Sequence, residues 1–462
     1  MNEFEQKVAD YCKKHSLVSA GDKVLVALSG GGDSVALFVC LLRIQHIFDI
    51  TVEAGHLNHS LRGTESDTDE IFSKELCDYF KVHLTVSRLV EGELKIKNES
   101  LESAARKARQ LFLESVANER SMTKIATGHN LDDLSETILQ RIIRGTGPSG
   151  LAGILPKRDN IWIRPLLDQS RSDIRVYLEE NGFGYRDDSS NNDTIFFRNR
   201  IRHELLPLLK DRFSSNITAS LTRLAELSRI QEEYLHEKML ESFKHCCFFK
   251  SSGKIILDKH KLMSYHKVLR QRIVRHCLEL LEGSGRDTDK EEIERILDCI
   301  SFEQSGMIDV TKEVRCGTGR NSAAFIKISQ QYKPFPLSVP GETWIPDDGR
   351  ITVRKISNRK TVDGKNVILL SPNVVTKYGP ITIGPATKGE YIIPFGMLKP
   401  VKVFDIFSAA SIPLILRDSI PVVRAGAVSV WIPGFKSSEC LRINDSCKNV
   451  LLMNYHDGPQ WE

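Results

Sequence analysis

The stretch VLVALSGGGDSVAL, from Val24 to Leu37, joins two apolar blocks through a cluster of glycines that ends in Asp33 and Ser34. Residues 23–28 are short, apolar and β-branched, which predicts a buried strand. Residues 34–48 have the pattern of a helix. Between a strand and a helix, glycines allow the backbone N–H groups to approach a phosphate closely, and the partial positive charge of the helix N-terminus favours the anion. The stretch therefore predicts a phosphate-binding loop.

This loop belongs to neither of the two commonest classes of nucleotide loop. A Walker loop requires Gly-x4-Gly-Lys followed by Ser or Thr, and a dinucleotide loop requires Gly-x-Gly-x-x-Gly. The stretch has neither pattern, and a plain glycine turn is the alternative. Ser29 and Ser34 add hydroxyl donors, whereas Asp33 would repel a phosphate directly. Asp33 is suited to hold Mg²⁺, which in turn holds phosphates.

Strands and helices alternate after this loop. Strands are expected at about 50–57, at 82–87 and in TKIATGHN, and helices at 66–80 and in the segment NESLESAARKARQLFLESVANE. LDDLSETILQRIIRG predicts a further helix that Gly145 closes. This order predicts an α/β fold with a doubly wound parallel sheet, in which ligands bind beyond the carboxyl ends of the strands.

The length of 462 residues predicts two or three domains. We expect a catalytic α/β domain at 1–214, a helical linker and middle domain at 215–330, and a β-rich, α+β domain at 331–462. The last two are expected to bind RNA. Residues 250–276 contain eight Lys and Arg against one acidic residue, so a helix there could follow phosphates. An amphipathic packing helix with a solvated basic side is the alternative.

Composition places the chain among cytosolic globular proteins. Hydrophobic residues make up 41% and charged residues 27%. The first residues carry charge throughout, unlike a secretory signal, and no run approaches the roughly 18 apolar residues of a membrane span. None of the ten cysteines forms a Cys-x-x-Cys pair, which fits a reduced compartment. The formal net charge of +4 permits an RNA partner.

Three further segments carry polar residues where the ligand crevice is expected. HLNHSLRG follows the second strand and contains His56 and Arg62. ESAARKAR places Arg106 and Arg109 on one helical face, which suits an anion or, alternatively, a solvated basic face. In GHNLDDLSET, Asp133 and Glu136 share a helix face just after a strand, which suits metal or general-base chemistry. Acidic residues are also common in first helical turns because of the helix dipole.

SGGGDS resembles the pyrophosphate loop of the N-type ATP pyrophosphatases, the PP-loop superfamily, which adenylate a carbonyl oxygen. With HLNHSLRG, ESAARKAR, GHNLDDLSETILQRIIRGTG, RPLLDQSRSDI and DDSSNNDTIFFRNRIRHELLPLL, the chain resembles the tRNA(Ile)-lysidine synthetase family. The resemblance is dense from about 24 to 209 and weaker over 395–440. It implies that ATP adenylates O2 of the wobble cytidine of an isoleucine tRNA with a CAU anticodon, and that the ε-amine of free lysine then expels AMP.

The resemblance also implies roles for individual residues. ATP would be bound by Ser29, Gly30, Gly31, Gly32, Asp33, Ser34, His56 and Arg62, with Mg²⁺ on Asp33. Arg109 would neutralise charge on the α-phosphate, while Asp133 and Glu136 would orient the lysine ammonium and accept its proton. The remaining residues expected to bind substrate are Arg106, His129, Arg198, Asn199 and Arg202. No membrane partner is expected, and a homodimer is compatible with the resemblance.

Three alternatives remain open at this stage. A tRNA thiolase of the same superfamily would need a cysteine pair or an iron–sulfur site near the loop, whereas Cys40 and Cys77 are alone in their segments. A synthetase or amidotransferase acting on a small molecule would need a source of ammonia. A non-catalytic nucleotide sensor or RNA-binding module would not need the acidic pair.

Overall fold

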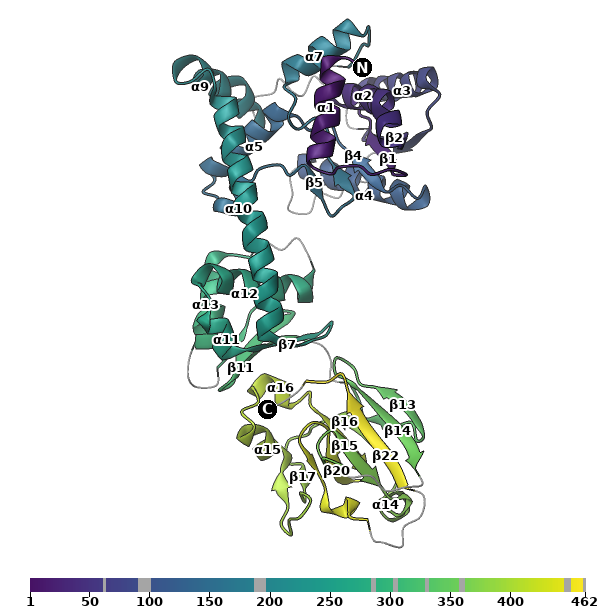
Figure 1. Ribbon diagram of the computed structural model, residues 1–462, viewed down its shortest axis with the longest axis vertical. Helices are drawn as coiled ribbons and strands as arrows, with labels where there is room; N and C mark the ends of the chain where they lie inside the picture. Colours follow the sequence, from purple (N-terminus) through teal and green to yellow (C-terminus); the bar gives the residue numbers. More distant parts are fainter. Residues whose placement is uncertain are drawn as a thin grey trace. The chain divides into compact units, whose positions relative to one another are not determined.

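The computed structural model describes residues 1–60, 64–89, 101–186, 197–283, 288–301, 306–328, 332–356, 362–443 and 450–459 (Figure 1). Contacts divide the chain into two compact units, Met1–Glu233 and Tyr234–Glu462. The three-domain division, with its boundaries after residues 214 and 330, stays a prediction. Among the described residues, no helix has the length and apolar character needed to cross a membrane.

The first unit is built on a mainly parallel sheet with the strand order β3-β2-β1-β4-β6-β5. β1, β2, β3, β4 and β6 run parallel to their neighbours, and β5 pairs antiparallel with β6. The strands are β1 (Lys23–Ala27), β2 (Thr51–Asn58), β3 (Leu84–Arg88), β4 (Lys124–Ala126), β5 (Lys157–Arg158) and β6 (Trp162–Ile163). The predicted doubly wound parallel sheet is therefore confirmed.

Helices cover both faces of this sheet because the strand residues alternate between two cores. Val24 and Val26 pack with α1 (Glu3–Lys14), α2 (Gly32–Phe48), α3 (Thr64–Phe80) and α7 (Arg171–Glu180). Leu25 faces the opposite way, into a core with Leu113 of α4 (Leu101–Glu119). This alternation is the period-two pattern of a strand that is buried on both faces.

A third core supports the helix that carries the acidic pair. Leu134 and Ile138 of α5 (Leu131–Ile143) pack against Ile201, Leu206 and Leu221. These partners come from the π-helical turn η2 (Ile201–Leu205), from α9 (Leu206–Arg212) and from α10 (Ile217–Cys246); the short helices α6 (Pro148–Leu151) and α8 (Phe197–Arg200) lie nearby in the chain. The apolar side of α5 is thereby fixed, and its polar side is free to face the carboxyl end of the sheet.

The middle part of the chain is helical, as expected, but it also contains a sheet that the sequence did not reveal. Its helices are α11 (Lys259–Ser264), α12 (Lys267–Glu282) and α13 (Lys290–Ser301). They share a core with an antiparallel sheet of order β7-β8-β11-β10-β9. The strands are β7 (Cys247–Lys250), β8 (Lys254–Asp258), β9 (Met307–Asp309), β10 (Val314–Thr318) and β11 (Ser322–Lys327).

Two further sheets, of orders β12-β16-β19-β20-β21 and β13-β14-β22-β15, enclose one core in the C-terminal part. A second core joins Ile256 and Ala324 of the middle sheet to Phe407 and Leu416. The elements are β12 (Phe335–Pro336), β13 (Gly341–Trp344), β14 (Arg350–Ile356), β15 (Val367–Leu370), α14 (Pro372–Tyr378), β16 (Ile381–Pro385), β17 (Tyr391–Ile392), β18 (Val401–Lys402), α15 (Val403–Ala409), α16 (Leu414–Arg417), β19 (Pro421–Ala425), β20 (Val428–Ile432), β21 (Lys436–Ser437), η3 (Glu439–Leu441) and β22 (Val450–His456). The expected β-rich, α+β texture is confirmed.

Candidate active site

The glycine loop closes on itself at the carboxyl end of β1. Gly30 has φ +86°, a left-handed conformation that suits glycine. The Ser34 hydroxyl donates to the Gly31 carbonyl at 2.8 Å and lies 3.2 Å from the Ser29 amide nitrogen, which donates to it. Helix α2 begins at Gly32, two residues before the predicted start, so Asp33 lies in its first turn. The loop therefore has the form expected for binding a phosphate group.

A cavity of about 730 Å³ opens in front of this loop. It is bounded by the ends of β1 and β2, by α4, by the segment between β4 and α5, and by α8 and η2. Most of the residues predicted for the site line it: Ser29, Gly31, Asp33, Ser34, His56, Arg106, Arg109, His129, Asp133, Arg198, Asn199 and Arg202. Gly30 and Gly32 belong to the loop without lining the cavity, and Glu136 is completely buried and does not line it either. Arg62 lies outside the described residues.

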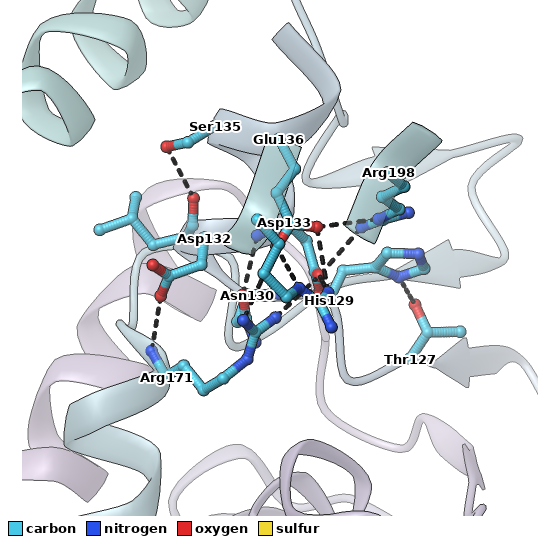
Figure 2. A network of polar contacts seen from close by, with 11 residues as sticks. Thr127, His129, Asn130, Asp132, Asp133, Ser135, Glu136, Arg171 and Arg198 are labelled. Carbon is cyan, nitrogen blue, oxygen red and sulfur yellow. Dashed lines mark hydrogen bonds and ion pairs between the residues drawn. The ribbon is translucent and has the colours of Figure 1, made fainter. Parts of the chain in front are cut away.

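The acidic pair of α5 is held by arginines that lie far from it in the sequence. Arg198 donates from Nη2 to Oδ1 of Asp133 at 2.9 Å and from Nε to Oε2 of Glu136 at 2.8 Å. Arg202 donates from Nε to Oε1 of Glu136 at 2.6 Å and from Nη2 to Oε2 at 3.1 Å. Figure 2 shows both carboxylates turned toward Arg198. The pair and its predicted neighbours are thus assembled into one charged network.

Burial and charge explain why this network is strong. Glu136 is completely buried, and Asp133 is 8% exposed. Burial alone would lower the pKa of Arg198, but the charges of Asp133 and Glu136 and the hydrogen bonds to them raise it above its usual value. Ion pairs that satisfy both oxygens of a buried carboxylate are costly to break from one side. The predicted role of Glu136 as a proton acceptor stays a prediction, because both of its oxygens accept hydrogen bonds from arginines in this arrangement.

Among the described residues, no arginine clamps Asp33 in a comparable way. Burial and the negative charge of Asp133 together raise the pKa of Asp33 to about 6, against the opposing positive charge of Arg171. The backbone of Gly128 approaches closely here: a Cβ on Gly128 would lie 3.0 Å from the carbonyl carbon and oxygen of Asp33. The described residues contain no cluster of three or more carboxylate, imidazole or thiol groups that would hold a metal by themselves. A single carboxylate such as Asp33 fits Mg²⁺ that is shared with the phosphates of a nucleotide, which is how this ion is commonly bound.

The two predicted histidines are both neutral in this site. Burial, together with the positive charges of Arg164 and Arg106, lowers the pKa of His129 to about 3. Its Nδ1 lies 2.8 Å from the Thr127 hydroxyl. Burial also lowers the pKa of His56. Neutral imidazoles do not add to the positive charge of the cavity and serve there as hydrogen-bonding groups.

Sequence reasoning missed two arginines in the segment RPLLDQSRSDI. Arg171 begins α7, donates its backbone N–H to Asp132 at 2.8 Å, and places Nη2 3.3 Å from Oδ1 of Asp133. Arg164 is buried, lines the cavity, and donates from Nη1 to the Leu155 carbonyl at 2.6 Å. The segment itself had been singled out, and its cationic residues were the signal that could have found both side chains.

The basic stretch at residues 250–276 is less exposed than its composition suggested. Lys254 is buried and pairs with Asp348 at 3.3 Å, and Lys259 is 6% exposed. On α12, Ile273, Val274 and Cys277 are buried in the core of the middle region. The amphipathic packing side of this helix is therefore present. RNA binding by its basic side stays a prediction.

Comparison with known proteins decides the family. A PP-loop domain model matches residues 1–209. The chain is 32% identical over 456 residues to a tRNA(Ile)-lysidine synthase of Clostridium acetobutylicum, covering 96% of this chain and 97% of the relative. It is 33% identical over 469 residues to one of Clostridium perfringens, covering 98% and 99%. The chain belongs to the tRNA(Ile)-lysidine synthase family.

This membership confirms the family predicted from the motifs and the expectation of an ATP-using ligase of the PP-loop type. Among solved structures, the chain is similar to a U34-tRNA thiolase from Methanococcus maripaludis that carries a [4Fe-4S] cluster. That match has 20% identity, a TM-score of 0.43, and covers 49% of this chain and 79% of the thiolase. A likeness at this level does not bear on the function of the present chain.

Proposed function

We propose that this chain joins free L-lysine to C2 of the wobble cytidine in an isoleucine tRNA with a CAU anticodon. ATP is converted to AMP and pyrophosphate, and the product is lysidine. The observation that carries the proposal is that Asp33 of the phosphate loop and Asp133 of α5 face one cavity, with Glu136 buried behind Asp133 in the same arginine network. The enzyme must first activate the cytidine with ATP and then bring an amine to the activated carbon. The phosphate loop and the acidic group must therefore both lie close to the reacting carbonyl of the cytidine.

The first step would form a bond between O2 of the cytidine and the α-phosphorus of ATP. The bond between the α- and β-phosphates breaks, and pyrophosphate leaves. Backbone N–H groups of residues 29–34 would hold the phosphates, and Asp33 would hold Mg²⁺, which when bound neutralises phosphate charge. Arg106 and Arg109 lie on the α4 wall of the cavity, where they would stabilise negative charge that develops on the transferred phosphate.

The second step would break the bond between C2 and O2 of the cytidine. The ε-amine of lysine attacks C2, AMP leaves with the oxygen, and the nitrogen loses its proton. An ammonium group is attracted by the same carboxylates that hold Arg198 and Arg202, so the lysine would compete with these guanidinium groups for Asp133 and Glu136. We propose that this exchange positions the amine, and that the released arginines contact the tRNA.

The C-terminal region offers a surface that suits RNA. Tyr391 and Phe395 are 50% and 53% exposed, and Leu398 is 95% exposed. The guanidinium of Arg442 lies 5.0 Å from the centre of the Phe395 ring. Exposed aromatic rings beside cations can stack on bases while the cations meet phosphates. This surface supports the proposal that residues 331–462 bind tRNA.

The decisive experiment is incubation of the chain with isoleucine tRNA, ATP and isotopically labelled lysine, followed by digestion of the tRNA to nucleosides. Label is expected in one modified cytidine and not in tRNA that carries a wobble uridine. Label that appears without ATP, or no label in any nucleoside, would contradict the proposal. Omission of Mg²⁺ is expected to abolish incorporation.

Size-exclusion chromatography with light scattering tests the predicted homodimer, and cell fractionation tests the predicted location in the cytoplasm.

A further inference from the structure

His56 is a buried histidine whose ring is hydrogen-bonded at one edge. It lies near the carboxyl end of β2, is 3% exposed, and lines the cavity in front of the glycine loop. Its Nδ1 lies 2.9 Å from the carbonyl oxygen of Leu28 and 3.3 Å from the hydroxyl oxygen of Ser73. The other nitrogen, Nε2, is buried and has no hydrogen-bond partner among the described residues.

The neighbours of Nδ1 assign the tautomer of the ring. A carbonyl oxygen only accepts, so Nδ1 must carry a hydrogen atom to bond to Leu28. The Ser73 hydroxyl donates its own hydrogen to the Asp69 carbonyl at 2.8 Å, so it also presents a lone pair to the ring. Because burial disfavours the charged imidazole, the ring is neutral and Nε2 carries a lone pair.

An acceptor buried without a partner is unfavourable, because it has lost its water without replacing it. The cavity that His56 lines is a candidate ligand site, and its lining combines apolar side chains such as Leu57 and Leu113 with charged ones such as Asp69 and Arg109. The triphosphate of ATP carries no hydrogen-bond donor at neutral pH, whereas the nucleoside carries the 6-amino group and the 2′- and 3′-hydroxyls.

We propose that Nε2 of His56 accepts a hydrogen bond from an N–H or O–H group of the nucleoside half of ATP, and that this contact makes His56 a specificity-determining residue for the nucleotide. The inference rests on the proposed function only in requiring that ATP occupy this cavity. It assigns His56 to the nucleoside, at a point beside the loop of residues 29–34 that holds the phosphates, because the His56 ring contacts the carbonyl of Leu28 directly before Ser29.

The test is equilibrium binding of ATP, 2′-deoxyATP, 3′-deoxyATP and purine riboside triphosphate, which lacks the 6-amino group, to the full chain. One of the three analogues is expected to bind on the order of 10-fold more weakly than ATP. That analogue identifies the donor. Equal affinity of all four nucleotides would overturn the proposal, and this comparison needs no altered protein.

A variant then tests whether His56 accepts the hydrogen bond from that donor group. In His56→Asn the amide is able to keep a donor toward Leu28, but the Nε2 acceptor is lost. ATP is expected to bind this variant about 10-fold more weakly, and the preference between ATP and the identified analogue is expected to disappear. Ser73→Ala is the matched control, since it removes a second acceptor of Nδ1 while Leu28 remains, and it is expected to keep the preference.

Thermal unfolding of each variant without nucleotide separates loss of fold from loss of contact. A preference that persists in His56→Asn would overturn the assignment to His56. The lysine-incorporation assay is independent of these measurements. A chain that discriminates the analogues through His56 but does not label tRNA contradicts the proposed function alone, and a chain that labels tRNA without discriminating them contradicts this inference alone.

Discussion

Arg202 and Glu136 form a two-point ion pair in which both oxygens of a fully buried carboxylate accept hydrogen bonds, at 2.6 Å to Oε1 and 3.1 Å to Oε2. The arginine lies on the π-helical turn η2 and the glutamate on α5. π-Helical turns often mark functional positions because they redirect one face of a helix. Here Arg198 and Arg202, on successive turns, reach the same glutamate.

The variant Glu136→Gln tests this arrangement. The amide is neutral and leaves the buried guanidinium groups without their full counter-charge, so we expect the free energy of unfolding to fall by about 3 kcal/mol. Lysine incorporation is expected to fall at least 100-fold, because neither the ammonium nor its proton finds a carboxylate at this position. Urea unfolding and the labelled-lysine assay measure the two effects.

The same variant separates the two chemical steps. Release of pyrophosphate that depends on tRNA, measured without lysine, is expected to remain within about 10-fold of the original rate, since Asp33 and the glycine loop are unchanged. Lysine incorporation at the unaltered rate would exclude Glu136 from the second step. Glu136→Asp is the charge-matched control and is expected to retain more lysine incorporation than Glu136→Gln.

Gly128→Ala probes the contact between the GHN segment and the glycine loop. The added Cβ would lie 3.0 Å from the backbone of Asp33 and 3.1 Å from the amide nitrogen of Ser34. Both contacts are with backbone at the start of α2, so the loop must shift. We expect the KM for ATP to rise on the order of 10-fold, because small displacements of phosphate-binding groups are costly.

The control for this substitution is Gly147→Ala, because a Cβ at Gly147 meets no atom within 4 Å. Steady-state kinetics with varied ATP are expected to be unchanged in this control. An unchanged KM for ATP in Gly128→Ala, with the protein folded, would show that the loop does not need the observed backbone approach.

Local patterns were sufficient to predict the fold of the first unit. The β-branched run at β1, the glycine cluster and the capping residues each act within a few positions, and the structure places them as expected. Gly145, for example, follows the C-cap residue Arg144 of α5 and has φ +80°, as expected of a glycine that closes a helix. The middle sheet escaped notice because its strands are short. Strands β7–β8 and β9–β10–β11 pair with their neighbours in the chain, and the two groups join only through β8 and β11, where Ser322 meets Asp258.

The candidate site was predicted as a set of residues but not as a network. Asp133, Glu136, Arg198 and Arg202 were all singled out, whereas their mutual ion pairs join positions 62 and 66 residues apart. Charge alone does not specify which partners meet across such a separation. Glu136 is buried and does not line the cavity, because other parts of the chain pack over α5. No local sequence pattern indicates this burial.

The raised pKa of Asp33 makes stability depend on pH. Its pKa moves from 3.8 to about 6, so between these values the folded chain holds a proton that the unfolded chain has released. Stability from this group is therefore lost as pH rises through that window, and the cost above pH 6 is roughly 3 kcal/mol. Asp33→Asn is expected to be more stable than the original chain at pH 7–8 and to lose this advantage near pH 4.

Thermal unfolding across this pH range, without ATP, checks the expectation. Mg²⁺ is expected to raise the unfolding temperature of the original chain and to have little effect on Asp33→Asn, while ATP–pyrophosphate exchange is expected to be lost in the variant. If Asp33→Asn gains no stability at neutral pH, the pKa of Asp33 is not raised by its surroundings. If the variant keeps full ATP–pyrophosphate exchange activity, Asp33 has no role in binding the phosphates.

The basic side of α12 is tested by the salt dependence of tRNA binding. Arg270, Arg272 and Arg275 are half-buried, and phosphate contacts made by their guanidinium groups would release counterions. Each contact contributes about 0.7 to 0.9 to the slope of log K against log salt concentration. Replacing all three with Gln is expected to reduce that slope by about 2.

The control variant replaces the exposed residues Lys13, Lys210 and Arg212 with Gln, which lowers the net charge by the same amount. An unchanged slope in the α12 variant would assign this helix to packing alone, as the burial of Ile273 and Val274 already requires of its other side.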